Sequence, residues 1–478
     1  MRGSDVELPL IIQGGMGVGV SGWQLAGAVG RSGGLGVVSG VGLDTVVARR
    51  LQDGDLDGEL RRAIAHFPAP GVASAVLERY FIPGGRPAHR PYRIVPRLTL
   101  DARLHRERLS VVAAFAQTYL ARSAAPGALI GINFLEKTQL ATPAAAYGAM
   151  LAGVDAVLVG AGIPARLPAL LDSLARHERV DFPIDVAGSA DTHYTLPFDP
   201  QVVLGDGVDN LRRPRFLAIV STHTLATYLA RDPGTRPDGF VIETSVAGGH
   251  NAPPRGALQL DKWGEPVYGA RDVPDLAQVK ALGLPFWLAG GYSNPERVEA
   301  ALSAGAKGAQ VGTPFALAAE SGLTAPVRQH LLDALKAGKL EVKTDVLASP
   351  TGYPFKVAKL PGTLSDPGIL ESRQRLCDLS YLRNPYVTPD GAVGYRCSAE
   401  PVDAWVSKGG QESQTKGRVC LCNGLMATIG IPQHRPSGYV EPPIVTLGSD
   451  LDGAHALLER HPGGWTAHDV ITYLTRQE

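Results

Sequence analysis

Short apolar runs alternate with longer amphipathic stretches over roughly the first 340 residues of this 478-residue chain. The runs are mostly continuously apolar and rich in Val, Ile and Leu, which is typical of parallel strands buried on both faces. The stretches between many of them have helical periodicity. The nine predicted strands cover residues 8–13, 36–39, 128–134, 156–160, 182–186, 216–221, 239–243, 286–289 and 308–311.

Repeated strand–helix units predict an α/β fold with right-handed crossovers, and eight such units close a (β/α)8, or TIM, barrel. The ninth strand, 182–186, lies in a Pro-rich stretch that is too long for a barrel loop, so we interpret 178–215 as an insertion. A second insertion is predicted over 44–126, with helical segments, the first of them over 46–65, around a Pro/Gly/Arg loop. Insertions of this kind usually build a lid or a substrate wall.

The pattern changes near residue 340. We therefore assign 1–340 to the barrel and 341–478 to a C-terminal extension that is rich in Pro, Gly, Ser and Tyr before two short helical pieces. All four cysteines of the chain lie in the extension, within a predicted Cys-rich module over about 370–430.

Charge and composition exclude several classes of protein. Lys and Arg total 46, as do Asp and Glu, so the chain lacks the basic field that nucleic-acid binding needs. No apolar run approaches the ~20 residues of a membrane helix, and the N-terminus lacks the apolar core of a signal peptide. We expect a soluble cytoplasmic protein that binds neither nucleic acid nor membranes.

A glycine-rich motif follows the first strand and contains GxGxxG at Gly17, Gly19 and Gly22. A dinucleotide-binding turn needs an acidic residue at the end of the next strand. That strand ends at Ser39, and the nearest acid, Asp44, comes too late. A dinucleotide-binding turn is therefore the least favoured of three interpretations. The other two are a tight strand–helix turn and a loop whose bare backbone lies against a flat ring cofactor.

A second motif, Gly248-Gly249-His250, follows the predicted strand 239–243. Two glycines allow a backbone to come close to a ligand. A His beyond the C-terminal end of a barrel strand lies where barrel enzymes carry out their chemistry. Although a lone His is more often structural, this position makes His250 the candidate catalytic residue.

Two further glycine motifs end successive strands, namely Gly290-Gly291 and Gly312-Thr313. If these are barrel strands seven and eight, their loops form the phosphate site that is usual in this fold. The backbone N–H groups would donate to phosphate oxygens. The alternative is a pair of ordinary turns.

Taken together, the motifs resemble a known family. IIQGGMGVGVSGWQLAGAVGRSGGLGVVSG, GINF, AGGH, LAGGY and GAQVGTPFALAAES occur in the order seen in the nitronate monooxygenase (2-nitropropane dioxygenase-like) family. Flavin-dependent enoyl-acyl reductases of fatty-acid and polyketide synthesis belong to the same superfamily. The resemblance covers roughly residues 8–325 and implies an FMN-binding barrel.

The resemblance also implies how FMN is held. The backbone of Gly15, Met16 and Gly17 would lie along the flavin ring, and Asn133 would contact it. Glu243 stands where relatives often have Gln. The remaining predicted contacts are Gly248 and Gly249 against the flavin, Gly290, Gly291, Gly312 and Thr313 at the phosphate, and His250 as the active-site His. The chain departs from the family in lacking the acid and Arg that often flank the AGGH segment.

Three functions are compatible with these residues. The first is oxidation of nitronates or nitroalkanes with O2, with His250 orienting the substrate or removing its α proton. The second is FMN-dependent reduction of an enoyl thioester, which adds NAD(P)H as electron donor and an acyl carrier protein as partner. The third is a non-enzymatic flavin or electron-transfer protein. A dehydrogenase that uses a barrel cysteine is excluded because no Cys precedes Cys377.

The extension holds a possible metal site of its own. Cys377, Cys397, Cys420 and Cys422 lie close enough in sequence to ligate one metal, and thiolates suit Zn²⁺ or a [4Fe–4S] cluster. The spacing matches neither the common zinc pattern nor a ferredoxin pattern. The alternative is that all four are small core residues.

Overall fold

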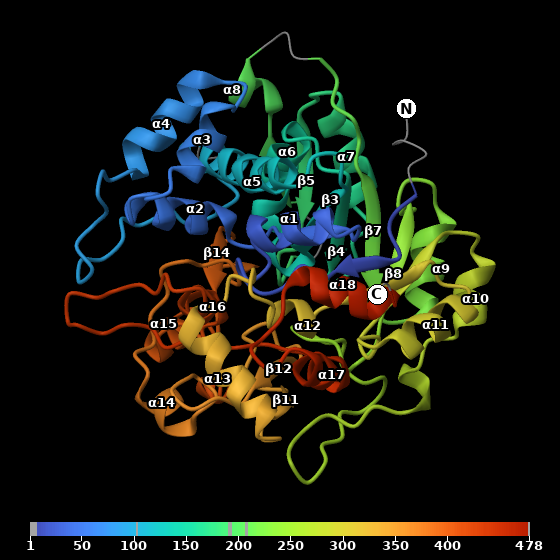
Figure 1. Cartoon of the computed structure of the whole chain (residues 1–478). Coiled ribbons are helices and arrows are strands. Elements are labelled where there is room, and N and C mark those ends of the chain that lie inside the picture. The colour runs from blue at the N-terminus through green and yellow to red at the C-terminus, as the bar shows by residue number, and fades with distance from the viewer. Residues whose placement is uncertain (1–6, 102–103, 190–193, 206–208, 477–478) are drawn as a thin grey trace.

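A computed structural model of the chain describes residues 7–101, 104–189, 194–205 and 209–476. Eight parallel strands form the central sheet in the order β1-β10-β9-β8-β7-β4-β3-β2 (Figure 1). The two edges of the sheet meet where Ile12 pairs with Leu35. At this seam the Gln13 N–H donates to the Leu35 carbonyl at 3.0 Å, and the Leu35 N–H donates to the Ile11 carbonyl at 2.9 Å. The predicted α/β barrel is confirmed.

The barrel strands are buried on both faces, as their apolar sequences predict. Their bounds are β1 (Ile11–Gln13), β2 (Gly36–Ser39), β3 (Ile130–Leu135), β4 (Ala156–Gly160), β7 (Arg215–Val220), β8 (Gly239–Glu243), β9 (Phe286–Ala289) and β10 (Gly308–Val311). The run that the sequence assigned to an insertion forms β5 (Val180–Ile184), which pairs antiparallel with β6 (Tyr194–Phe198) outside the barrel.

Helices surround the barrel strands (Figure 1). In the barrel half they are α1 (Trp23–Arg31), α2 (Leu43–Gln52), α3 (Glu59–Ala65), α4 (Pro70–Tyr80), α5 (Leu104–Ala124), η1 (Glu136–Ala141), α6 (Thr142–Leu151), α7 (Leu167–Ala175), α8 (Pro200–Leu204), α9 (His223–Arg231), η2 (Ala270–Asp272), α10 (Leu276–Ala281), α11 (Pro295–Ser303), α12 (Thr313–Ala316) and α13 (Ala325–Lys336). Two of them correct the sequence analysis. The helix expected over 46–65 is broken into α2 and α3 by Gly54 and Gly58, which have φ angles of 101° and 72°, and α4 was not predicted.

The C-terminal residues carry two small hairpins, five α-helices and one 3-10 helix in the described part of the chain. Their bounds are β11 (Val342–Asp345), β12 (Phe355–Ala358), α14 (Pro367–Ser372), β13 (Asn384–Val387), β14 (Val393–Arg396), α15 (Val402–Ser407), η3 (Glu412–Thr415), α16 (Leu421–Thr428), α17 (Asp452–Arg460) and α18 (Ala467–Thr475). This segment, orange to red in Figure 1, lies largely on the side of the barrel away from α3 and α4.

The C-terminal segment packs against helices α1 and α12 of the barrel half. Leu25 and Phe315 of the barrel share one buried apolar cluster with Met426, Leu457 and Trp465. The Trp465 indole N–H also donates to the Pro314 carbonyl at 2.8 Å. Burial of apolar surface at this contact therefore stabilises both parts of the chain together.

Two general properties of the chain bear on the sequence analysis. None of the described helices is long and apolar enough to cross a membrane. All four cysteines are free thiols.

Close packing of α1 on β2 yields a stability test. A Cβ atom at Gly36 would lie 1.8 Å from the Ala26 carbonyl oxygen, so we expect Gly36→Ala to lower the free energy of unfolding by about 1–3 kcal/mol or more. The matched control is Gly71→Ala in α4, where an added Cβ meets nothing within 4 Å. Urea denaturation checks both variants, and an unchanged midpoint for Gly36→Ala would contradict this packing.

Candidate active site

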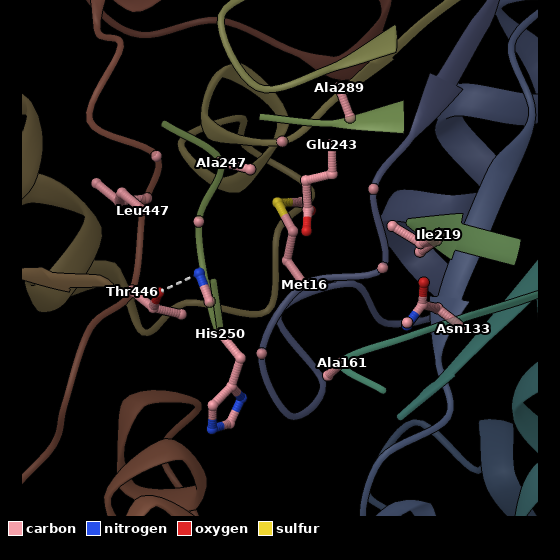
Figure 2. Close-up of a pocket in the computed structure, with 18 of the residues that line it drawn as sticks. Met16, Asn133, Ala161, Ile219, Glu243, Ala247, His250, Ala289, Thr446 and Leu447 are labelled. Carbon is pink, nitrogen blue, oxygen red and sulfur yellow. Dashed lines mark hydrogen bonds between the residues drawn. The ribbon is translucent and has the colours of Figure 1, made fainter. Parts of the chain in front are cut away.

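A pocket of about 1550 Å³, counting the open space at its mouth, lies at the C-terminal ends of the barrel strands. All twelve residues that the sequence assigned to the barrel site line this pocket: Gly15, Met16, Gly17, Asn133, Glu243, Gly248, Gly249, His250, Gly290, Gly291, Gly312 and Thr313. They come together because parallel strands end at the same edge of the barrel. Figure 2 shows Asn133 and Ile219 across the pocket from Thr446 and Leu447.

The loop after β1 is fixed by two buried side chains. The Gln13 amide accepts a hydrogen bond from the Val37 N–H at 3.0 Å and donates to the Ser21 hydroxyl at 2.8 Å and to the Gly14 carbonyl. Ser21 in turn donates to the Gly14 carbonyl and accepts from the Met16 N–H. Because these bonds hold both ends of the loop, its glycine backbone forms a rigid wall of the pocket.

The loop after β1 approaches β3 so closely that position 15 has room only for glycine. A Cβ atom there would lie 2.3 Å from the Cβ of Asn133 on β3. The loop therefore lies directly on the strand that carries Asn133. A dinucleotide-binding turn would need an acidic residue at the end of β2. Ser39 stands there instead, and its hydroxyl donates to the Gly17 carbonyl at 2.6 Å.

The two glycine turns after β9 and β10 present unused hydrogen-bond donors. Gly290 and Gly291 have φ angles of 79° and 83°, which side chains rarely adopt. None of the backbone hydrogen bonds among the described residues uses the N–H groups of Gly290, Gly291 or Gly312. Nearby, the Gln310 side-chain oxygen also lines the pocket and is buried with no hydrogen-bond partner among the described residues. These groups are free to bind a polar ligand.

The loop that carries His250 is held by the C-terminal extension. The Gly249 N–H donates to the Thr446 hydroxyl at 2.9 Å (Figure 2). The Lys356 N–H donates to the Gly249 carbonyl, and the Asn251 N–H donates to the Pro354 carbonyl, both at 2.9 Å. The loop is thus pinned on both sides by residues about 100 and 200 positions further along the chain.

His250 is packed as a neutral imidazole. Its Nε2 lies 2.7 Å from the Ser349 hydroxyl, and its ring packs edge-on against Phe355 at 4.9 Å between centroids. Burial, with a smaller effect of the Lys137 charge, lowers the pKa of His250 to about 3. So weak a base suits hydrogen bonding to a substrate rather than removal of its α proton, the other role that the sequence analysis left open.

Two further groups near the pocket have shifted pKa values. Burial raises the pKa of Glu243 to about 8, so its carboxyl is protonated at neutral pH. Burial, partly offset by Glu136, lowers the pKa of Lys137 to about 8. The Lys137 ammonium lies 3.1 Å from the centroid of the Tyr353 ring. A neutral acid and a cation therefore coexist in this region at pH 7.

Sequence reasoning missed one complete wall of the pocket. The C-terminal extension contributes several side chains to it, namely Phe355, Tyr381, Leu382, Leu421, Cys422, Leu425, Met426, Thr446 and Leu447. By contrast, neither the 44–126 nor the 178–215 segment contributes a described residue to the lining. The wall that we expected from the insertions is thus built by the extension. No spacing in the sequence marks these residues, because each contact joins distant parts of the chain.

Tyr381 is anchored at that wall by a buried charged group. Its hydroxyl hydrogen-bonds the Asp44 carboxylate and lies 2.6 Å from the Thr45 hydroxyl. Asp44 also forms a buried ion pair with Arg106 of α5. Burial, with the Asp44 charge, raises the pKa of Tyr381, so it remains a neutral phenol.

The four cysteines lie together beside this pocket. Cys377, Cys397, Cys420 and Cys422 all line one small neighbouring pocket, and Cys422 lines the main one as well. The sequence analysis placed the cysteines in a site of their own, and Cys422 adjoins the main pocket as well. Among the described residues, no three His, Cys, Asp or Glu side chains are arranged to hold a metal ion. The single-zinc alternative, which needs sulfurs ~2.3 Å from one point, is therefore not supported.

One family model matches a part of the chain that forms much of the pocket. The nitronate monooxygenase family matches residues 206–354, which include the His250 loop and the turns after β9 and β10. A comparison with curated proteins gives no match.

Similar solved structures come from several bacteria. FabK from Thermotoga maritima is 15% identical, with 99% of this chain and 93% of that chain covered and a TM-score of 0.47. A nitroalkane oxidase from Streptomyces ansochromogenes is 18% identical, with coverages of 98% and 95% and a TM-score of 0.46. The enoyl reductase domain of MlnA from the macrolactin biosynthesis cluster of Bacillus amyloliquefaciens is 12% identical, with coverages of 98% and 93% and a TM-score of 0.48.

The shifted pKa values predict the pH dependence of a reaction with an anionic substrate. As the pH rises through about 8, Glu243 gains a negative charge and Lys137 loses a positive one, and both changes disfavour the anion. We expect kcat/KM of the wild type to fall above that pH as two groups lose a proton. In Glu243→Gln or Lys137→Gln only one of these groups remains, so the fall should follow the loss of one proton. No change is expected at the ordinary pKa of His, about 6.5. A change in kcat/KM near pH 6.5 that disappears in His250→Gln would contradict a neutral His250 imidazole.

Proposed function

We propose that this protein is an FMN-dependent oxidoreductase that oxidises alkyl nitronates with O2. The observation that carries the proposal is the electrostatic state of the pocket. A neutral His250 beside a cationic Lys137 suits a substrate that arrives as an anion and needs no proton removed. A nitronate is such an anion, and the family match over residues 206–354 supports the same chemistry.

The residues present fit FMN. The loop at Gly15 has no room for a Cβ atom and offers a bare backbone edge on which a flat ring would lie. The unused N–H groups of Gly290, Gly291 and Gly312 suit phosphate oxygens, with Thr313 beside them. Gly248 and Gly249 would complete the ring site next to Asn133. When bound, FMN would accept the electrons of the substrate and pass them to O2.

The side chains of this chain would position the substrate. His250, held by Ser349 and Phe355, would hydrogen-bond the nitro oxygens through the ring nitrogen that Ser349 leaves free. Lys137 would add a favourable potential for the anion. Glu243, protonated at neutral pH, would act as a hydrogen-bond donor where a carboxylate would repel the substrate.

A second candidate is reduction of an enoyl thioester with NAD(P)H. The observation that favours it is the apolar part of the extension wall, where Leu382, Leu421, Leu425 and Met426 line the pocket. A wall of this kind suits an acyl chain better than a small nitronate. In this reaction His250 and Tyr381 would lie near the thioester.

Anaerobic stopped-flow absorbance separates the two functions. We expect the flavin of the holoprotein to bleach on mixing with propyl-2-nitronate and to stay oxidised with NADH or NADPH. Bleaching by NADPH followed by reoxidation with crotonyl thioester would overturn the proposal and establish enoyl reduction. If the chain took up no FMN, both functions would fail.

The role of His250 has its own test. Loss of a hydrogen bond to a charged group costs about 1.5–3 kcal/mol, so His250→Ala should lower kcat/KM for the nitronate by about 10- to 100-fold. The flavin content should not change. The matched control is His468→Ala on the exposed face of α18. Unaltered turnover in His250→Ala would remove His250 from the site.

A further inference from the structure

One wall of the main pocket is an apolar face of helix α16. Leu421, Cys422 and Leu425 of this helix line the pocket. Cys422 and Leu425 stand three positions apart, so both lie on the same face of the helix. Their side chains are only partly buried, whereas those of Leu421 and Met426 beside them are fully buried. The face that carries Cys422 and Leu425 is therefore open to the pocket.

This wall is continuous with the surroundings of His250. Phe355 packs edge-on against the His250 ring, with 4.9 Å between the two centroids. Phe355 also shares one buried apolar cluster with Leu382 and Leu421, and Leu425 packs against the same cluster. A molecule whose polar end is hydrogen-bonded to His250 therefore has a continuous apolar surface next to it.

The polar side chains of α16 do not reach the pocket. Asn423 and Thr428 are buried and are not among the residues that line it, and the Asn423 amide donates to the Asp378 carboxylate at 2.7 Å. Tyr381 does line the pocket, but its hydroxyl bonds to Asp44. A polar ligand group would lose its hydrogen bonds to water at this wall, whereas a hydrocarbon chain has none to lose. The wall thus favours an apolar part of a ligand.

The same helix packs beside the loop after β1. Met426 and Ile429 share an apolar cluster with Val18, and a Cβ atom at Gly19 would lie 2.9 Å from Ile429 Cδ1. These contacts begin just after Gly17, the last residue of the backbone edge proposed for the flavin ring. The open face of α16 therefore adjoins the proposed ring site without forming part of its glycine edge.

We propose that this face of α16, together with Leu382 and Leu421, binds the alkyl chain of the substrate, and that the protein prefers nitronates with a long unbranched chain to small ones. Because His250 would hold the nitro oxygens, the chain would extend from there along Phe355 and Leu421 to Leu425. The proposal rests on nitronate oxidation as the function and names the class of nitronate. An acyl thioester carries the same kind of chain and is the second source that the experiment distinguishes.

The size of the expected effect follows from the burial of methylene groups. Each methylene that moves from water to an apolar surface tightens binding by about fourfold. A chain that extends past the wall gains nothing further, so the effect should level off once the chain is longer than the path from His250 to Leu425.

Binding of straight-chain carboxylates to the FMN-loaded protein tests the subsite without turnover. A carboxylate shares the planar anionic head of a nitronate, with two oxygens, but is not oxidised by a flavin. We expect the Kd, measured from the change in flavin absorbance, to fall by about fourfold per methylene from acetate to hexanoate. The kcat/KM for alkyl nitronates of the same chain lengths should rise by the same factor.

Substitutions at one position of the wall sharpen the test. Leu425→Ser should raise the Kd of hexanoate by about tenfold or more and leave that of acetate unchanged. Leu425→Phe should fill the subsite, so that hexanoate loses affinity while acetate does not. The matched control is Leu302→Ser, which alters a leucine that is 43% exposed on α11 and should keep the wild-type constants. FMN content and circular dichroism identify the variants that remain folded.

The proposal is overturned if the Kd of the wild type does not depend on chain length. It is also overturned if Leu425→Ser keeps the wild-type dependence, and loss of FMN affinity in that variant would then show that the wall covers the flavin. If carboxylates show the dependence but no nitronate is oxidised, the proposed function fails and the subsite stands. If NADPH also reduces the flavin and a hexenoyl thioester reoxidises it, the chain is that of an acyl group, and a nitronate as its source is overturned.

Discussion

One buried amide, that of Gln13, connects the closure of the barrel to the shape of its site. The backbone of Gln13 bonds to Leu35 across the seam between β1 and β2. Its side chain bonds to Val37 on β2 and to Ser21 and Gly14 in the following loop. All these groups are buried, and an unsatisfied buried amide would cost about 1–3 kcal/mol. The glycine loop that faces the pocket therefore has one conformation only while the seam is closed.

A second constraint comes from the far end of the chain. The barrel supplies the glycine turns, whereas the extension supplies the partners that hold the His250 loop and an apolar wall opposite Asn133. The same wall separates the main pocket from the cysteines. The neutral state of His250 follows from this arrangement, because Ser349 and Phe355 of the extension bury its ring.

The sequence was sufficient for features that depend on local patterns. Continuous apolar runs located all eight barrel strands, and the omission of 182–186 was right because Pro and polar residues surround that run. The glycine motifs at Gly15, Gly248 and Gly290 reach one pocket because the topology of a parallel barrel brings strand ends together. These inferences needed only strand order and the conformational freedom of glycine.

Features that depend on contacts between distant residues had no such signal. Nothing in the spacing of Asp44 and Tyr381, or of Gly249 and Thr446, indicates that they meet. The low pKa of His250 has no signal in the sequence either, since burial is a property of the folded chain. The helix break at Gly54 was also missed, although its glycine was visible.

The clamp on the His250 loop has a consequence for the order in which the protein becomes functional. During synthesis the eight barrel strands leave the ribosome well before Thr446 does, so the barrel can begin to fold while the loop after β8 still lacks its partners. A nascent chain at that stage would have its glycine turns formed but no fixed imidazole. The proposed chemistry at the pocket would then begin only after the wall that encloses it is in place.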